Sequence, residues 1–392
     1  MFFEELDLYR AGDHGYHECR IPALVTTKQG TILAFNEARK STGRDSDQID
    51  IFLRRSFDGG KSFDDVQVVA TKEGWVSGNP APVQDRDTGT IWLPFCRNMC
   101  EQPGGVRGEN LIKQGKAARE VWIASSDDDG ATWAQPTQIT NDVKLDNWSW
   151  YATGPGHSIQ LSSGRLLVAC DHCEIVNRDP KSDPDFSHVI YSDDHGASWH
   201  IGGITDRFAN ESTAVETVDG RVCINCRNQF FGKGHDPYFR RIGWSNDGGL
   251  TFSPLVRDAG LSETVCEGSI CRYTVAGEPG ASSSPGAGPG GTGIPGRPSD
   301  RNRVLFCNPG TGQEGNRRQL TVRMSYDEGR TWPVAKVICE AGSSYSDLCI
   351  APDGTICCLY ERGSEGGVSF YSGDIAFARF DLEWLTDGED RL

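Results

Sequence analysis

An eight-residue pattern, Ser-x-Asp-x-Gly-x-Ser/Thr-Trp/Phe, occurs five times in this chain and constrains its fold more than any other feature. The copies begin at Ser56, Ser126, Ser192, Ser245 and Ser325. In each copy the Asp can accept hydrogen bonds from its own turn, the Gly can adopt a positive φ, and the aromatic ring can pack beneath the turn. We interpret each copy as a structural hairpin clasp that carries no chemistry. Regular recurrence of such a turn predicts a radial array of similar units.

Short apolar runs bounded by turn residues surround the clasps, and helical periodicity is nearly absent. The runs lie at residues 31–35, 49–53, 90–95, 120–124, 165–169, 188–191, 221–225, 303–306, 320–324 and 355–360. Such runs predict strands and an all-β fold. Five clasps and a last strand group ending near Phe380 predict a six-bladed β-propeller with four strands in each blade.

The predicted propeller occupies residues 1–392 as a single domain, because propellers can hold this length around one core. One segment interrupts the pattern. Residues 277–299 consist almost entirely of Gly, Pro, Ser, Ala and Thr. Such a composition has little apolar surface to bury, so we predict a disordered insertion between strands.

Charge and hydropathy narrow the classes of partner. The net charge of −16 argues against nucleic acid, whose binding depends on Lys and Arg that neutralise phosphates. No apolar run is long enough to predict a membrane span. The start of the sequence has neither a basic region nor an apolar core, so we expect no secretory signal and a cytoplasmic location.

Two Cys-x-x-Cys strings, Cys170–Cys173 and Cys223–Cys226, stand among the 14 cysteines. Such strings can bind zinc. Both lie in strand-like runs, however, and an offset of three places the two thiols on opposite faces of a strand. We therefore favour buried free thiols that pack as small hydrophobic groups.

The clasps, together with Arg20-Ile21-Pro22, make the chain resemble the sialidase family from about residue 10 to residue 385. The resemblance implies that three arginines hold a substrate carboxylate, and their matches here are Arg20, Arg227 and Arg317. By its spacing from the fifth clasp, Arg317 is a better match than Arg318. The residue type suits the task, because a planar guanidinium binds a carboxylate with two hydrogen bonds and keeps its charge.

The resemblance also implies a catalytic set. Tyr345 matches the nucleophile, Glu211 the glutamate that polarises it, and Asp45 the acid/base, with Asp47 as the alternative. The chemistry accounts for the tyrosine. A sialic acid carries a carboxylate on its anomeric carbon, which would repel an anionic Asp or Glu nucleophile. A neutral phenol avoids that repulsion, and sialidases differ from most glycosidases in using one.

Four further residues match substrate-binding positions by the same resemblance. Glu361 matches the glutamate that orients Arg20, and Arg39 matches an additional pocket arginine. Asn79 matches a position that contacts the C5 substituent of the sugar. Where many sialidases have two aromatic residues near the glycerol tail, this chain has Cys-Asp-His-Cys. Strand alternation allows only one of the middle two to face the pocket, and we favour Asp171.

These residues predict a retaining exo-sialidase that acts on sialylated glycans without a metal or a cofactor. A second possibility keeps the fold and changes the sugar to a related 2-ulosonic acid, such as deaminated neuraminic acid or ketodeoxyoctonate. A third possibility is a non-catalytic carbohydrate-binding propeller. The third is disfavoured because a binding protein has no need of Tyr345 together with Glu211 and Asp45.

Overall fold

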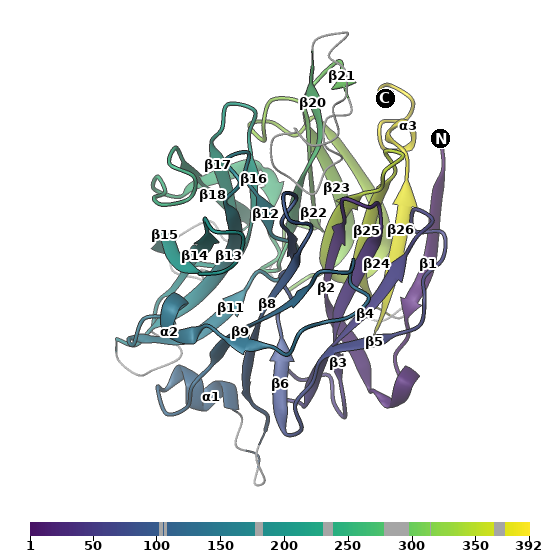
Figure 1. Ribbon diagram of the computed structural model, residues 1–392. Coiled ribbons are helices and arrows are strands. Elements are labelled where there is room, and N and C mark those ends of the chain that lie inside the picture. The colour runs from purple at the N-terminus through teal and green to yellow at the C-terminus, as the bar shows by residue number, and fades with distance from the viewer. Residues whose placement is uncertain are drawn as a thin grey trace.

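The computed structural model describes residues 1–101, 105, 108–176, 183–229, 238–277, 298–313, 315–363 and 373–392. Within these residues the protein is built almost entirely of antiparallel strands (Figure 1). The prediction of an all-β fold is therefore confirmed. Most of the insertion expected at residues 277–299 lies outside the described residues.

The strands form four hydrogen-bonded sheets. The first contains β2 (Glu18–Thr26), β3 (Ile32–Arg39), β4 (Ile49–Ser56), β5 (Gln67–Ala70), β6 (Trp75–Gly78), β7 (Val83–Gln84), β8 (Ile91–Met99), β9 (Glu120–Ser126) and β10 (Thr137–Gln138). The second contains β11 (Trp148–Thr153), β12 (Ile159–Gln160), β13 (Leu166–Glu174), β14 (Asp185–Ser192) and β15 (His200–Arg207).

The other two sheets complete the described strands. The third contains β16 (Ala209–Glu216), β17 (Val222–Asn228), β18 (Phe239–Ser245) and β19 (Val256–Ser262). The fourth contains β1 (Phe3–Tyr9), β20 (Ser269–Ala276), β21 (Pro298–Ser299), β22 (Arg303–Pro309), β23 (Arg318–Ser325), β24 (Val334–Ile350), β25 (Ile356–Gly363) and β26 (Gly373–Phe380). The helices are short: a 3-10 turn at Asp13–Gly15, α1 (Gly108–Lys113), α2 (Thr140–Val143) and α3 (Leu382–Leu385).

The fourth sheet is organised by the pairing of its terminal strands and by one long strand. Strand β1 pairs antiparallel with β26, so the first and last strands lie side by side (Figure 1). The long strand β24 pairs with β23 through its first half and with β25 through its second half. The second half of β24 carries Tyr345 into the interior of the molecule.

Each clasp follows a strand that ends in its serine, and its hydrogen bonds are local. In the second copy, Asp128 accepts hydrogen bonds from the Ser126 hydroxyl at 2.9 Å and from the Thr132 backbone N–H at 2.8 Å. Gly130 has a φ of 79°, a conformation that favours glycine. The closing aromatic rings pack against the hydrophobic core at Phe63, Trp133, Trp199, Phe252 and Trp332. The clasps thus have the structural role that the sequence predicts.

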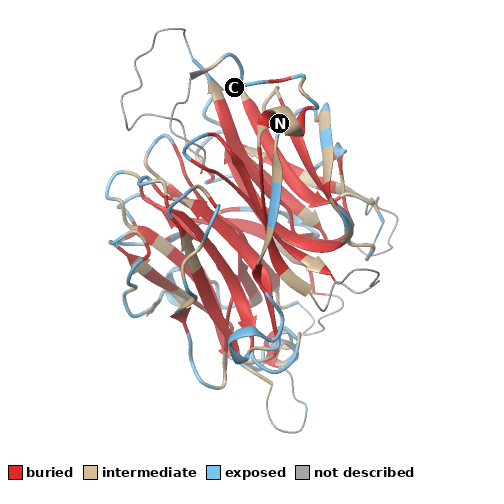
Figure 2. Ribbon diagram, turned by 90° about the vertical axis from the view of Figure 1, so that its right-hand side faces the viewer, coloured by how far each residue is buried: buried red, intermediate tan, exposed pale blue. Residues whose placement is uncertain are grey.

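The core packs between successive groups of strands, both within a sheet and between neighbouring sheets. The strands are buried along most of their length and the turns are exposed (Figure 2). All ten apolar runs named above coincide with strands. Each strand continues past the C-terminal end of its run by one to several residues. The four cysteines of the Cys-x-x-Cys strings are buried and form no disulfide in the structure. In the first string, Cys170 packs in a hydrophobic cluster and the Cys173 thiol contacts Asp185. None of the described helices is long and apolar enough to cross a membrane.

Candidate active site

Tyr345 on β24 lies against Glu211 on β16 and Arg227 on β17. The Tyr345 hydroxyl donates a hydrogen bond to Glu211 Oε1. Arg227 Nη1 donates to Glu211 Oε2 at 2.5 Å and to the Tyr345 hydroxyl oxygen at 3.0 Å. Burial raises the pKa of Tyr345 well above its usual range, and the charge of Glu211 raises it further. The tyrosine is therefore a neutral phenol whose proton points at a carboxylate.

Arg20 on β2 is fixed by Glu361 on β25. The Arg20 guanidinium donates to both carboxylate oxygens, at 3.1 and 3.0 Å, and the backbone N–H of Ile21 donates to the first of them at 2.9 Å. Burial favours the neutral acid, but the adjacent Arg20 charge outweighs it and lowers the pKa of Glu361. The guanidinium carbon lies 5.7 Å from the centre of the Tyr345 ring. Glu361 thus orients Arg20 beside the tyrosine.

Arg317 stands just before β23 and approaches Tyr345 from a third direction. Its guanidinium carbon lies 5.5 Å from the centre of the Tyr345 ring. Its nitrogens donate to the Ser344 hydroxyl at 2.9 Å and to the Val265 carbonyl at 2.7 Å. Arg20, Arg227 and Arg317 therefore surround one phenol and concentrate positive charge there in an otherwise acidic protein.

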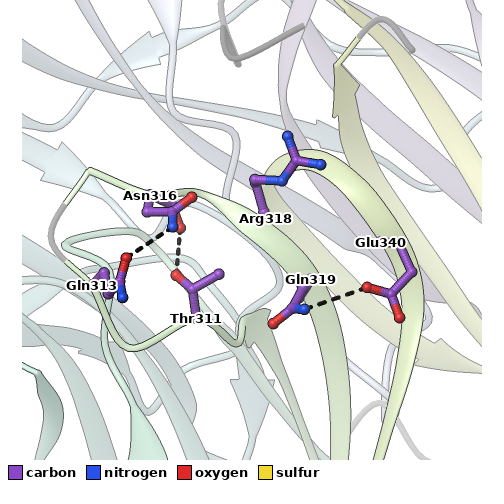
Figure 3. A pocket seen from close by; sticks show the side chains of 6 residues that line it. All are labelled: Thr311, Gln313, Asn316, Arg318, Gln319 and Glu340. Carbon is purple, nitrogen blue, oxygen red and sulfur yellow. Dashed lines mark hydrogen bonds between the residues drawn. The ribbon is translucent and has the colours of Figure 1, made fainter. Parts of the chain in front are cut away.

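Arg318, the neighbouring residue, belongs to a different place. Its side chain lines a separate polar pocket of about 450 Å³ (Figure 3). The other residues that line this pocket are Thr311, Gln313, Asn316, Gln319 and Glu340. The geometry therefore places Arg317, and not Arg318, with the other two arginines.

Asp45 lies in the loop between β3 and β4, at the edge of the arginine group. Its carboxylate is 2.8 Å from Arg39 Nη2 and 4.0 Å from Arg20 Nη1, and its side chain is 62% exposed. Desolvation raises its pKa, but Arg39 and Arg20 outweigh this effect and lower the pKa to about 2. Asp47 instead accepts hydrogen bonds from the backbone N–H groups of Ser41 and Thr42, both at 2.6 Å. Asp47 thus shapes the loop, whereas Asp45 faces the site.

Asn79, directly after β6, belongs to a group of polar side chains that adjoins Arg39. Glu37 joins the two, because its carboxylate pairs with Arg39 at 2.8 Å and accepts from the Asn79 backbone N–H at 2.7 Å. The Asn79 side-chain oxygen accepts a hydrogen bond from Arg119 Nη2. Arg119 also donates a hydrogen bond to the Asn98 side-chain oxygen. We refer to Glu37, Asn79, Asn98 and Arg119 as the amide wall.

Asp171 on β13 is more deeply buried than the sequence suggests. The residue is 0% exposed, and its Oδ1 accepts from the Asn210 side chain at 3.2 Å. Burial raises the pKa of Asp171 well above its usual range, with a contribution from the charge of Glu211. His172 points to the opposite face, where its ring stacks on Trp148 at 3.6 Å between centroids. A direct contact of Asp171 with a sugar thus stays a prediction, since the structure connects it first to Asn210.

The arrangement can bind an anion and transfer protons. Three guanidinium groups can hold a planar carboxylate at one end of the site. A phenol bonded to a carboxylate can act as a nucleophile when that carboxylate takes its proton. An exposed carboxylate at the rim can exchange a proton with a leaving oxygen or with water. Together these groups suit the cleavage of a glycoside that carries a carboxylate beside the bond that breaks.

Sequence reasoning missed Glu37 and Arg119 as parts of this site. Glu37 stands in the Glu-Ala-Arg segment before the acid/base loop, two residues from Arg39, and strand alternation places both on one face. That alternation was a usable signal. Arg119 lies far along the sequence, outside the motifs that the resemblance rests on, and its contact with Asn79 spans 40 residues.

Comparison with known proteins identifies the class. Residues 30–358 match a family model described as a BNR repeat-like domain. The sialidase of Micromonospora viridifaciens is 33% identical over 98% of this chain, which spans 54% of that relative. The exo-alpha-sialidase of Aspergillus fumigatus is 30% identical over 95% of this chain and 86% of its own length.

Solved structures agree on the fold. The Hadza microbial sialidase Hz136 superimposes with a TM-score of 0.80 at 26% identity, covering 97% of this chain and 69% of its own. The intramolecular trans-sialidase from Ruminococcus gnavus has a TM-score of 0.73 at 16% identity, covering 97% and 98%, and shows the shared fold alone. The fold is thus of the all-β, propeller type. The chain belongs to the sialidase family of glycoside hydrolases.

Proposed function

We propose that the protein is a retaining exo-α-sialidase that releases terminal sialic acids through a tyrosine nucleophile. The observation that carries this proposal is the contact of Tyr345 with both Glu211 and Arg227, with Arg20 and Arg317 near the same ring. The sialidases of Micromonospora and Aspergillus among its relatives support the same activity.

In the proposed reaction the substrate carboxylate binds Arg20, Arg227 and Arg317. Glu211 takes the proton of Tyr345 as the phenol oxygen attacks the anomeric carbon, and Asp45 protonates the leaving oxygen. The carboxylate of the bound substrate offsets the Arg20 charge that lowers the pKa of Asp45, so Asp45 can hold this proton. Asp45 then removes a proton from water, which attacks the same carbon, while Glu211 returns its proton to the phenol oxygen and Tyr345 is released. Two displacements on one carbon give net retention of configuration.

The propeller that carries the site is proposed to have six blades. Five clasps each connect the last two strands of a group, and these groups run from β2 to β5, β6 to β10, β11 to β15, β16 to β19 and β20 to β24. The sixth group consists of the second half of β24 with β25, β26 and β1. Pairing of β1 with β26 would close the ring and remove its free edges.

The proposal is tested with 4-methylumbelliferyl glycosides of sialic acid, deaminated neuraminic acid and ketodeoxyoctonate. We expect turnover of the sialic acid glycoside or of its deaminated counterpart, and proton NMR of the first product formed should show the α-anomer. Turnover of the ketodeoxyoctonate glycoside alone would support the alternative sugar. Appearance of the β-anomer first would contradict the retaining mechanism. Binding of the sugars without turnover of any glycoside would instead support the carbohydrate-binding alternative.

A further inference from the structure

The amide wall holds the Asn79 side chain in a single orientation. Arg119 is nearly fully buried, and each part of its guanidinium has a partner. Its Nε donates to the Tyr151 carbonyl at 2.5 Å, and its Nη1 donates to the Asn98 side-chain oxygen. Its carbon also lies 4.1 Å from the centre of the Trp150 ring. The guanidinium is therefore fixed before any ligand arrives.

This fixed guanidinium decides which end of the Asn79 amide faces it. A guanidinium has only N–H donors, so the atom of Asn79 that meets Arg119 Nη2 must be the oxygen. The amide nitrogen consequently points the other way. Within the described part of the chain no hydrogen bond occupies that nitrogen, although the residue is only 9% exposed. Asn79 thus presents two unused N–H donors from a nearly buried position.

Asn98 provides a comparison within the protein. Its side chain contacts the same guanidinium, and both its oxygen and its nitrogen form hydrogen bonds with the protein. Its oxygen accepts from Arg119, and its nitrogen donates to the Met99 carbonyl at 2.9 Å. One amide of the wall is therefore fully used by the protein, and the other keeps a donor available.

The Asn79 amide nitrogen is accessible to solvent, although the residue is nearly buried. Glu37 joins Asn79 to Arg39, whose Nη2 lies 2.8 Å from Asp45, so the amide wall adjoins the rim of the site. If the arginines around Tyr345 hold the carboxylate on C2, we place the amide wall at the far side of the sugar ring. In a six-membered 2-ulosonic acid ring the atom across from C2 is C5.

We propose that Arg119 is a positioning residue that fixes Asn79 as a donor, and that Asn79 thereby selects a sugar with oxygen on C5. This inference rests on the function proposed above. A 5-hydroxyl oxygen can accept a hydrogen bond from the Asn79 amide. The nitrogen of a 5-acetamido group, which takes the place of that hydroxyl oxygen, can only donate, and the acceptor of the group, its carbonyl oxygen, lies two bonds farther from the ring. The enzyme therefore prefers a deaminated 2-ulosonic acid to its N-acetylated counterpart.

The test compares two 4-methylumbelliferyl glycosides that differ only in a 5-hydroxyl or a 5-acetamido group. We expect the wild-type kcat/KM to be about tenfold or more higher for the 5-hydroxyl substrate. A site built to hydrogen-bond one polar group discriminates against a substrate that cannot form that bond. In Asn79→Asp one carboxylate oxygen can stay with Arg119 while the other accepts a hydrogen bond. This variant should shift the ratio by about tenfold or more toward the 5-acetamido substrate.

Asn98→Asp is the matched control, because it makes the same chemical change at the amide whose oxygen and nitrogen are both hydrogen-bonded to the protein. Its substrate ratio should equal that of the wild type. A wild-type preference for the 5-acetamido substrate would overturn the proposal, as would an Asn79→Asp ratio within about twofold of the wild type.

A binding measurement separates this inference from the proposed function. Calorimetric titration with the two 2,3-didehydro sugars, one with a 5-hydroxyl and one with a 5-acetamido group, gives a ratio of Kd values without turnover. If neither glycoside is hydrolysed, the proposed function fails, and the Kd ratio then tests the inference. A wild-type preference for the 5-hydroxyl sugar that Asn79→Asp reverses supports it, and equal ratios overturn it.

Discussion

The clasps and the candidate active site, here called the pocket, both contain carboxylates that accept several hydrogen bonds. The partners are near in sequence in a clasp and far apart in sequence in the pocket. In the second clasp, Asp128 binds Ser126 and Thr132, which lie two and four residues away. In the pocket, Glu211 meets Tyr345 across 134 residues, and Arg20 meets Glu361 across 341. A clasp can therefore form from its own segment, whereas the pocket exists only after the whole chain has folded.

The two regions also differ in exposure, and this difference sets the cost of a change. The clasp carboxylates lie at the surface, where water replaces a lost partner at little cost. The carboxylates of Glu211 and Glu361 are buried beside fixed charges, so removing one partner leaves a buried charge poorly compensated. We expect substitutions in the pocket to change activity or stability strongly and those in a clasp to change stability alone.

The largest expected effect comes from Tyr345→Phe. Removing the phenol oxygen eliminates the proposed nucleophile, so kcat should fall by about 10³-fold or more, as for other catalytic nucleophiles. The melting temperature should change little, since one hydroxyl contributes about 1 kcal/mol. Steady-state kinetics with a 4-methylumbelliferyl substrate measures the first effect and calorimetry the second. Activity close to that of the wild type would exclude Tyr345 from the mechanism.

Glu361→Gln should have the next largest effect. The substitution removes the carboxylate that binds the buried Arg20 guanidinium through two hydrogen bonds and leaves the more distant Asp45, at 4.0 Å, so the free energy of unfolding should fall by about 3 kcal/mol. The substrate KM should also rise, because Arg20 is less firmly oriented. Urea unfolding of the two proteins gives the stability difference. A loss below about 1 kcal/mol would show that this pair behaves like a surface ion pair.

Asp171→Ala should have an intermediate effect. The carboxyl is buried and reaches the site through Asn210, so kcat/KM should fall by about tenfold as one buried hydrogen bond is lost. If Asp171 acts only through Asn210, to which its Oδ1 is hydrogen-bonded, the loss should be equal for substrates with intact and truncated glycerol tails. A loss confined to the intact tail would instead indicate that Asp171 contacts the tail.

Asp128→Ala should have the smallest effect, and only on stability. The clasp should lose about 1 kcal/mol, with kcat unchanged. Hydrogen bonds from Thr132 and Ser126 lower the pKa of Asp128 to about 2 from 3.8, so the folded state favours the ionised form. This contribution is present above pH 3.8 and is lost as the pH falls through about 2. The stability difference between wild type and variant should therefore shrink over that interval, and a constant difference would contradict this assignment.

The sequence alone predicted the strands and clasps because both depend on local chemistry. An apolar run such as residues 303–306 favours a strand whatever surrounds it, and Asp128 finds its partners within its own turn. The strands are longer than the runs because pairing with neighbours extends them past the apolar residues. Strand β13, for example, continues through Asp171 and His172 to Glu174.

The motifs around Arg20, Glu211 and Tyr345 predicted the residue types of the site from the sequence, but their contacts depend on tertiary structure. Burial of Asp171, the separation of Arg317 from Arg318, and the orientation of the Asn79 amide all depend on side chains from distant strands. Arg119 illustrates the limit, because only its position beside Asn79 gives it a role. Local hydrogen bonds and apolar patterning can be read from neighbouring residues, whereas burial and amide polarity are set by partners that the fold brings together.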